Sequence, residues 1–248
     1  MSTQFVAHRG GCVEFNPLFE NQVPAYRYAH QCGMNAWETD VHLTKDQILM
    51  MHHDATIQAR IVEDLTFAEC QRLTDHHVNQ LTELLAFLEH QITLFIDIKG
   101  PNIFIADKLL EETANYNSQQ IVFICFDVDI VRRLCELKAK NRIYLLTNYA
   151  DESATFRLRK PEDIAPVHKI IHELSLSGIG LEYHDNDEEI RYIVQELRRN
   201  KPELEFQLWS FLKFEGERLQ RLALDLNINY CNTDYPKKTL QWLHNKEK

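Results

Sequence analysis

Short apolar runs alternate along the chain with longer stretches in which apolar residues recur every three or four positions. The short runs are typical of buried strands, and the longer spacing is typical of amphipathic helices. Strand-like runs begin at residues 4, 36, 48, 94, 121, 142, 178, 205 and 228. The helical spacing predicts helices over residues 21–31, 66–72, 81–88, 129–138, 162–174, 187–199 and 215–226.

The run that begins at residue 48 is connected differently from the others. Residues 43–47 are too few for a parallel crossover, so this run should return antiparallel to the run at 36–41 as a hairpin. The remaining eight strands alternate with helices, which is typical of a closed (β/α)8 (TIM) barrel. An open doubly wound sheet is the alternative, but no nucleotide-binding or nucleophile-elbow motif supports it. We expect one α/β barrel domain over residues 1–248, with the hairpin as an extra antiparallel strand.

Composition narrows the classes of function. The chain is 44% hydrophobic and carries a formal net charge of −10, which argues against general binding to nucleic acid or anionic membranes. The six cysteines show no C-x-x-C spacing, so neither a zinc knuckle nor a thioredoxin-like motif is expected. No leader and no apolar run of about 20 residues is evident, so we expect a reduced, cytoplasmic protein without stable membrane insertion.

Candidate chemistry begins with two carboxylates on one strand. Glu38 and Asp40 are two residues apart, so both project from the same face of an extended strand. Like charges held so close repel, and an all-oxygen pair favours Mg²⁺ or Ca²⁺ over zinc as the neutralising ion. The hairpin return should bring His53 near this pair.

Two further strand ends carry charged residues. His8 and Arg9 precede two glycines at the end of the first strand, and Asp97 and Lys99 share a face of the strand that begins at residue 94. The rim of one barrel would bring all of these groups together. Three carboxylates can then hold a metal, two histidines can exchange protons, and Arg9 with Lys99 can neutralise a phosphate. This inventory indicates a phosphoester reaction.

Each pattern also has an ordinary structural interpretation. A His-Arg-Gly triplet is usually a turn, Glu-x-Asp is commonly a solvated face, and Asp97 with Lys99 can form an ion pair. Glu182 and His184 follow another strand and could line the same rim. The convergence of four sets on one rim favours the functional interpretation.

The order of these motifs resembles that of the glycerophosphodiester phosphodiesterase family. The strongest matches are His8-Arg-Gly10, Glu20-Asn21, Glu38-Thr-Asp-Val41, Leu43-Thr-Lys-Asp46, His53-Asp54 and Asp97-Ile-Lys99. Weaker matches follow in Phe123-Ile-Cys-Phe-Asp127, Leu208-Trp-Ser210 and Asn232-Thr-Asp-Tyr-Pro236.

The resemblance implies a TIM barrel that hydrolyses glycerophosphodiesters, small molecules such as glycerophosphocholine, to sn-glycerol 3-phosphate and an alcohol. By matching position it implies the following roles: His8 and His53 as acid and base, Arg9 and Lys99 as phosphate ligands, and Glu38, Asp40 and Asp97 as ligands of one divalent cation. Glu20, Glu182 and Trp209 would be substrate or metal neighbours. The family route uses the glycerol 2-hydroxyl as nucleophile, whereas the residues alone equally allow direct attack by water.

The chain departs from the family pattern at several positions. Asp97 replaces the usual Glu, and the late Trp-Thr-Val-Asn has become Trp209-Ser-Phe-Leu212. The loop after His53 looks compressed, and a shorter cover would expose the pocket.

Two other functions compete with this interpretation. One is cleavage of lipid phosphodiesters, as in sphingomyelinase D or a lysophospholipase D, which would need an exposed apolar rim. The sphingomyelinase relatives are secreted and disulfide-bonded, unlike the pattern expected here. The other is a non-catalytic phosphate-binding barrel, which predicts lost catalytic groups, and none is lost.

Overall fold

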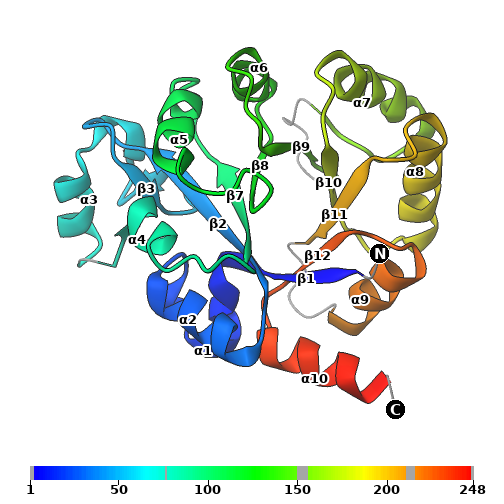
Figure 1. Cartoon of the computed structure of the whole chain (residues 1–248), viewed down its shortest axis with the longest axis horizontal. Coiled ribbons are helices and arrows are strands. Elements are labelled where there is room, and N and C mark those ends of the chain that lie inside the picture. The colour runs from blue at the N-terminus through cyan, green and yellow to red at the C-terminus, as the bar shows by residue number, and fades with distance from the viewer. Residues whose placement is uncertain (1–2, 76, 150–155, 211–215, 247–248) are drawn as a thin grey trace.

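Eight parallel strands form a closed barrel in the computed structural model, which describes residues 3–75, 77–149, 156–210 and 216–246. The barrel strands are β1 (Gln4–Ala7), β2 (Ala36–Leu43), β7 (Thr93–Ile98), β8 (Ile121–Cys125), β9 (Arg142–Thr147), β10 (Gly178–Glu182), β11 (Glu205–Trp209) and β12 (Tyr230–Thr233). Closure comes from β1, which pairs in parallel with both β12 and β2. The predicted (β/α)8 barrel is therefore confirmed (Figure 1).

Helices surround the strands in Figure 1. They are α1 (Cys12–Phe15), α2 (Val23–Cys32), α3 (Phe67–Leu73), α4 (Leu81–Leu85), α5 (Ile105–Thr113), α6 (Val128–Glu136), α7 (Pro161–Glu173), α8 (Asp187–Asn200), α9 (Gly216–Asp225) and α10 (Pro236–Lys246). The sequence analysis did not predict α5 or α10. Phe211, Leu212 and Glu215, which belong to predicted segments, lie outside the described residues.

An insertion between β2 and β7 carries the predicted hairpin return. Its strand β3 (Leu49–Met51) pairs antiparallel with β2, with Val41 opposite Met51, which confirms the hairpin. The insertion continues through β4 (Thr56–Ile57), β5 (Arg60–Ile61) and β6 (Asn79–Gln80), and β6 pairs with β3. It has its own buried cluster, made of Met50, Ile57, Val62, Leu65, Phe67, Cys70 and Val78.

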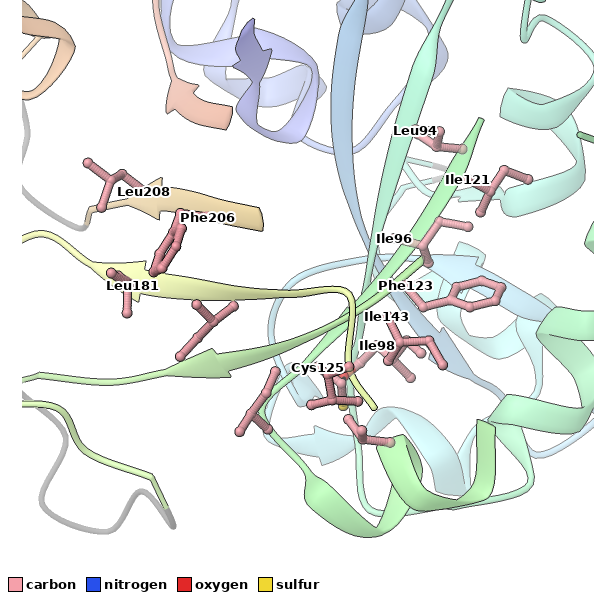
Figure 2. Close-up of a cluster of buried hydrophobic side chains, with 14 of the residues drawn as sticks. Leu94, Ile96, Ile98, Ile121, Phe123, Cys125, Ile143, Leu181, Phe206 and Leu208 are labelled. Atoms are coloured by element: carbon pink, nitrogen blue, oxygen red, sulfur yellow. The ribbon is translucent and has the colours of Figure 1, made fainter. Parts of the chain in front are cut away.

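Alternate residues of each barrel strand contribute to two separate cores, because successive side chains point to opposite faces. One core fills the barrel, where Phe95, Ile124 and Leu146 pack together. The other lies between strands and helices, and Figure 2 shows side chains of β7 to β11 that belong to it, such as Ile96 and Phe123. Burying a large apolar side chain of this kind stabilises the fold by roughly 1.5–3 kcal/mol. Both faces of the parallel strands are therefore mostly apolar. The barrel interior is polar at the rim and at its amino end, where Nη1 of Arg142 lies 3.1 Å from Oε2 of Glu205.

Two expectations from the sequence concern the cysteines and membrane insertion. The six cysteines are free thiols, and four of them, Cys12, Cys70, Cys125 and Cys231, are buried. Among the described residues, no helix is both long and apolar enough to cross a membrane.

Candidate active site

The predicted catalytic groups meet in a pocket at the carboxyl ends of the barrel strands. The pocket is lined by His8, Arg9, Glu38, Asp40, His53, Asp97, Lys99, Ile124, Phe126, Leu146, Gln207, Trp209, Ser210 and Asn232. Seven predicted residues and Trp209 are thus brought together from β1, β2, β7, β11 and the insertion. The individual roles assigned to them stay predictions.

A left-handed turn at the end of β1 shapes one wall. Arg9, Gly10 and Gly11 have φ values of 49°, 77° and 69°, a region that glycine adopts without strain. A Cβ on Gly10 would lie 2.8 Å from the Cβ of Ala25, so a side chain there would collide with α2. The turn directs the backbone N–H of Arg9 toward Glu38, to whose Oε2 it donates a hydrogen bond of 2.9 Å. It thereby fixes His8 and Arg9 beside the carboxylates.

Three buried carboxylates form the candidate metal centre. Glu38, Asp40 and Asp97 are 2%, 1% and 6% exposed, and one oxygen of each lies within 4.8 Å of the others. Burial and the adjacent charge of Asp40 raise the pKa of Glu38 to about 8, and burial also raises the pKa of Asp97. Oδ1 of Asp97 is buried with no hydrogen-bond partner among the described residues. A hard divalent cation would satisfy this oxygen and allow all three groups to ionise, so the residues fit the implied ion.

Two basic side chains border the same carboxylates. Nζ of Lys99 lies 3.0 Å from Oδ1 of Asp40 and 2.5 Å from Oδ2 of Asp97. Nε of Arg9 lies 3.2 Å from Oδ2 of Asp40. Burial disfavours the charged form of Asp40, but Lys99 and Arg9 outweigh that effect and hold its pKa well below the ordinary value.

The formal charges of this centre do not balance when all three carboxylates are ionised, as they would be with a metal bound. The three carboxylates carry three negative charges, and Arg9 and Lys99 carry two positive charges, so the centre then has a net charge of −1. A divalent cation together with a singly charged phosphodiester would bring the sum to zero. Charge balance therefore favours an anionic ligand bound with a metal over either one alone.

His8 is held by an aspartate that the sequence analysis did not assign. Its Nδ1 lies 2.7 Å from Oδ1 of Asp234, just after β12, and its Nε2 lies 3.9 Å from Oε2 of Glu38. Burial alone would lower the pKa of His8, but the hydrogen bond to Asp234 and the charge of Glu38 raise it above the ordinary value. The signal that could have found Asp234 is its place directly after a strand, within the weaker family motif.

His53 has the same kind of partner. Its Nδ1 lies 2.8 Å from Oδ1 of Asp54, its neighbour in sequence. In both histidines a carboxylate engages Nδ1, which leaves Nε2 to face other groups.

Asn21 supports the candidate metal centre, and the sequence analysis did not assign it a role. Its Nδ2 donates to Oδ2 of Asp40 at 2.8 Å, and its Oδ1 accepts from the backbone N–H of Asp40 at 3.1 Å. The side chain is 1% exposed. Its place in the Glu20-Asn21 motif was the available signal.

Glu20 and Glu182, the other two predicted neighbours of the substrate or metal, do not themselves line the pocket. Oε1 of Glu20 accepts from Nη1 of Arg9 at 2.9 Å, so in this structure Glu20 holds the guanidinium and is not a lining residue of the pocket. Glu182 accepts a hydrogen bond from the backbone N–H of Tyr149 at 2.5 Å and does not line the pocket either. Nearby, burial and the charge of Arg159 lower the pKa of His184 to about 4.

Comparison with curated proteins shows similarity to phosphodiesterases. Human glycerophosphodiester phosphodiesterase 1 is 31% identical over 113 residues, 38% of this chain and 33% of its own length. Glycerophosphodiester phosphodiesterase of Caldanaerobacter subterraneus is 27% identical over 50% of this chain and 58% of its own length. The matches thus span a third to just over half of these relatives. Human lysophospholipase D GDPD1 is 24% identical over 98% of this chain and 87% of its own length.

Solved structures share the fold over almost the whole chain. A glycerophosphodiester phosphodiesterase from Thermotoga maritima superposes with a TM-score of 0.75 at 21% identity, covering 98% of this chain and 99% of its own. An Oleispira antarctica phosphodiesterase, solved with the product sn-glycerol-3-phosphate, superposes with a TM-score of 0.72 at 15% identity, covering 98% and 97%. The model of the glycerophosphoryl diester phosphodiesterase family matches residues 8–238. The chain therefore belongs to the glycerophosphoryl diester phosphodiesterase family, whose members are phosphoric diester hydrolases.

Proposed function

We propose that this protein hydrolyses glycerophosphodiesters to sn-glycerol 3-phosphate and an alcohol, with one divalent cation and two histidines. The observation that carries the proposal is the convergence of three buried carboxylates, two cations and two carboxylate-paired histidines in one pocket. Family membership and the product named for the Oleispira antarctica structure agree with it.

The anion-binding half of the proposed site lies on β1, β2 and β7. Glu38, Asp40 and Asp97 would hold Mg²⁺ or Ca²⁺, which when bound supplies positive charge to phosphate oxygens. Arg9 and Lys99 are already desolvated and charged, and would bind the remaining phosphate oxygens. Their present contacts with Asp40 keep both side chains directed into the site.

His8 and His53 are assigned the proton transfers. One removes the proton from the attacking oxygen as its bond to phosphorus forms, and the other protonates the alcohol oxygen as its bond to phosphorus breaks. The attacking oxygen belongs either to the glycerol 2-hydroxyl, which gives a cyclic phosphate that water then opens, or directly to water. Trapping a cyclic phosphate in a single turnover followed by ³¹P NMR distinguishes the two routes.

The function is tested by measuring release of sn-glycerol 3-phosphate from a panel of soluble glycerophosphodiesters in Mg²⁺, Ca²⁺ or chelator. Metal-dependent release from at least one soluble diester is expected. Correctly folded His8→Ala and His53→Ala proteins should lose nearly all turnover, and full activity in either would refute its assignment. Absence of turnover with every diester and metal would refute the proposed activity itself.

A second candidate, cleavage of a lipid phosphodiester, is favoured by one specific observation. Among the described residues, six of the seven large apolar side chains that are exposed lie in segments after β1, after β2 or after β7: Val13, Phe15, Leu18, Ile61, Ile103 and Phe104. Leu18 is 74% exposed and Phe104 is 60% exposed. These segments follow the strand ends that carry the pocket, so apolar groups are presented at the catalytic end of the barrel, as lipid access requires. The similarity to human lysophospholipase D GDPD1 agrees with this candidate.

Serine substitutions separate the two candidates. If lipid is the substrate, Leu18→Ser and Phe104→Ser should lower kcat/KM for micellar lysophosphatidylcholine while sparing glycerophosphocholine. Tyr192→Ser on α8 is the matched control, because Tyr192 is 42% exposed but lies on a helix of the barrel wall. No activity on lysolipid, or equal effects of the three variants, would remove the lipid candidate.

A further inference from the structure

Several polar side chains that line the pocket have no place in the chemistry assigned above, and Gln207 is the most buried of them. Gln207 on β11 lines the pocket and is 1% exposed. Its Nε2 donates to Oδ1 of Asn232 on the neighbouring strand β12 at 2.8 Å. Its Oε1 is buried and has no hydrogen-bond partner among the described residues.

An unsatisfied amide oxygen in such a place is costly. A buried carbonyl without a hydrogen bond destabilises the folded protein, and most buried polar groups in native proteins are paired. The bond to Asn232 fixes the amide plane, so the oxygen does not rotate freely to find another donor. Ile124 and Leu146, which line the same pocket, offer no donor from their side chains. A ligand with a donor group would satisfy Gln207.

The chemistry of the proposed substrate identifies that donor. Ester and phosphate oxygens of a diester accept hydrogen bonds but do not donate them, whereas the hydroxyls of glycerol donate. The carboxylates lie on β2 and β7 and the cationic groups directly after β1 and β7, whereas Gln207 and Asn232 lie on β11 and β12. Since β12 pairs with β1, the amides are placed beside the phosphate-binding half of the pocket.

We propose that Oε1 of Gln207 accepts a hydrogen bond from the free primary hydroxyl of the substrate's glycerol, with Asn232 as the positioning residue. This assignment rests on the proposed function and deepens it. The primary hydroxyl is chosen because the 2-hydroxyl is the candidate nucleophile and must remain free to react. Gln207 thereby selects diesters of glycerol over diesters of diols that lack this hydroxyl.

The test compares glycerophosphocholine with the phosphocholine diester of propane-1,2-diol, which keeps the 2-hydroxyl and lacks the primary one. Wild-type protein should prefer glycerophosphocholine in kcat/KM by about 10- to 100-fold. Gln207→Met keeps the volume of the side chain and removes both polar atoms. It should reduce this preference to near unity because kcat/KM falls for glycerophosphocholine alone. Gln207→Leu is a second variant, in case the methionine protein folds poorly.

Gln220→Met is the matched control. Gln220 is 5% exposed and donates from Nε2 to Oγ1 of Thr239 at 2.8 Å, but it lies on α9 outside the barrel. Its substitution should leave the preference intact. If the role of Gln207 is purely structural, Gln207→Met should lower kcat/KM for both diesters by the same factor. That result, or an unchanged preference, overturns the proposal.

A measurement of ligand binding, which needs no turnover, distinguishes failure of this proposal from failure of the proposed reaction. Calorimetry with a divalent ion present compares sn-glycerol 3-phosphate with propane-1,2-diol 1-phosphate on wild-type and Gln207→Met proteins. A preference for the glycerol phosphate that disappears in the variant supports the assignment even if no diester is hydrolysed. Equal binding of the two ligands by wild-type protein refutes it.

Discussion

Replacing Asp234 by Asn removes the charge that holds His8 and preserves the shape of its partner. Oδ1 of Asp234 lies 2.7 Å from Nδ1 of His8, and the two side chains are 31% and 23% exposed. An amide at this position can still accept the hydrogen bond, so the ring orientation should persist. What is lost is the negative charge that stabilises the imidazolium.

The size of the effect follows from the contact. A hydrogen bond to a charged group contributes about 1.5–3 kcal/mol, and partial exposure places this pair at the lower end. Since each ~1.36 kcal/mol is a factor of ten, kcat/KM should fall about tenfold. Circular dichroism and thermal melts should show an intact fold.

The pH profile of kcat/KM carries the sharper prediction. Asp234 contributes to raising the pKa of His8, so Asp234→Asn should lower that pKa. If His8 acts as acid, activity is lost as pH rises through its pKa, and the alkaline limb of the profile should move to lower pH. If His8 acts as base, activity is gained as pH rises through its pKa, and the acid limb should move to lower pH. The limb that moves thus assigns the role.

Asp54→Asn is the matched control. The same contact, 2.8 Å, joins Asp54 to His53, but the side chain of Asp54 is 73% exposed. Solvent screening should limit its loss to about threefold. An Asp234→Asn enzyme with an unchanged rate and unmoved limbs, or a larger effect at Asp54, would refute the reasoning.

Two further predictions concern the metal and the turn. Mg²⁺ or Ca²⁺ should raise the thermal midpoint of the wild-type protein by mass action, and chelator should abolish its turnover. The Asp40→Asn protein should show neither the metal-dependent rise in midpoint nor metal-dependent turnover. Turnover that persists in chelator contradicts the metal assignment. Gly11→Ala should cost more than about 2 kcal/mol in urea unfolding, because its φ is 69° and its Cβ would lie 2.1 Å from Cγ of Pro236. Gly33→Ala is the control: Gly33 also has a positive φ, 97°, but the atom nearest to its added Cβ would be 3.7 Å away, so a cost of about 1 kcal/mol is expected. Equal costs for the two variants would show that the contact with Pro236 is relieved.

The sequence predicted the barrel because its strands are short, apolar and separated by helical spacing. The hairpin was readable from the length of its connection alone. Helix α5 was not predicted, although Ile105 and Leu109 have helical spacing, because the Gly100-Pro101 pair shortly before it is typical of a turn that ends a strand. Helix α10 was missed because Lys237 and Lys238 at its start resemble a solvated tail, whereas the buried contact of Thr239 with Gln220 joins it to α9.

The site was predictable to the extent that its charged residues follow barrel strands. His8, Asp40 and Asp97 could be placed on one rim from strand order alone. The residues that orient them could not, because a hydrogen bond such as that from Asn21 to Asp40 joins the segment before α2 to strand β2, and their relative positions depend on the whole fold. The same holds for Asp234, which is separated from His8 by almost the entire chain.

The insertion between β2 and β7 also places one of the two proposed catalytic histidines outside the barrel. His53 sits not on the barrel but just after β3, whose position depends on three paired residues of β2 and on a small core of its own. A small unit with few buried side chains opens more readily than the barrel that supports it. Opening of the insertion, which would displace His53, and unfolding of the barrel are therefore expected to be separate equilibria. Amide hydrogen exchange should show that the insertion opens at a lower free energy than β7 or β8. Mutations in the core of the insertion should lower turnover while the barrel stays folded.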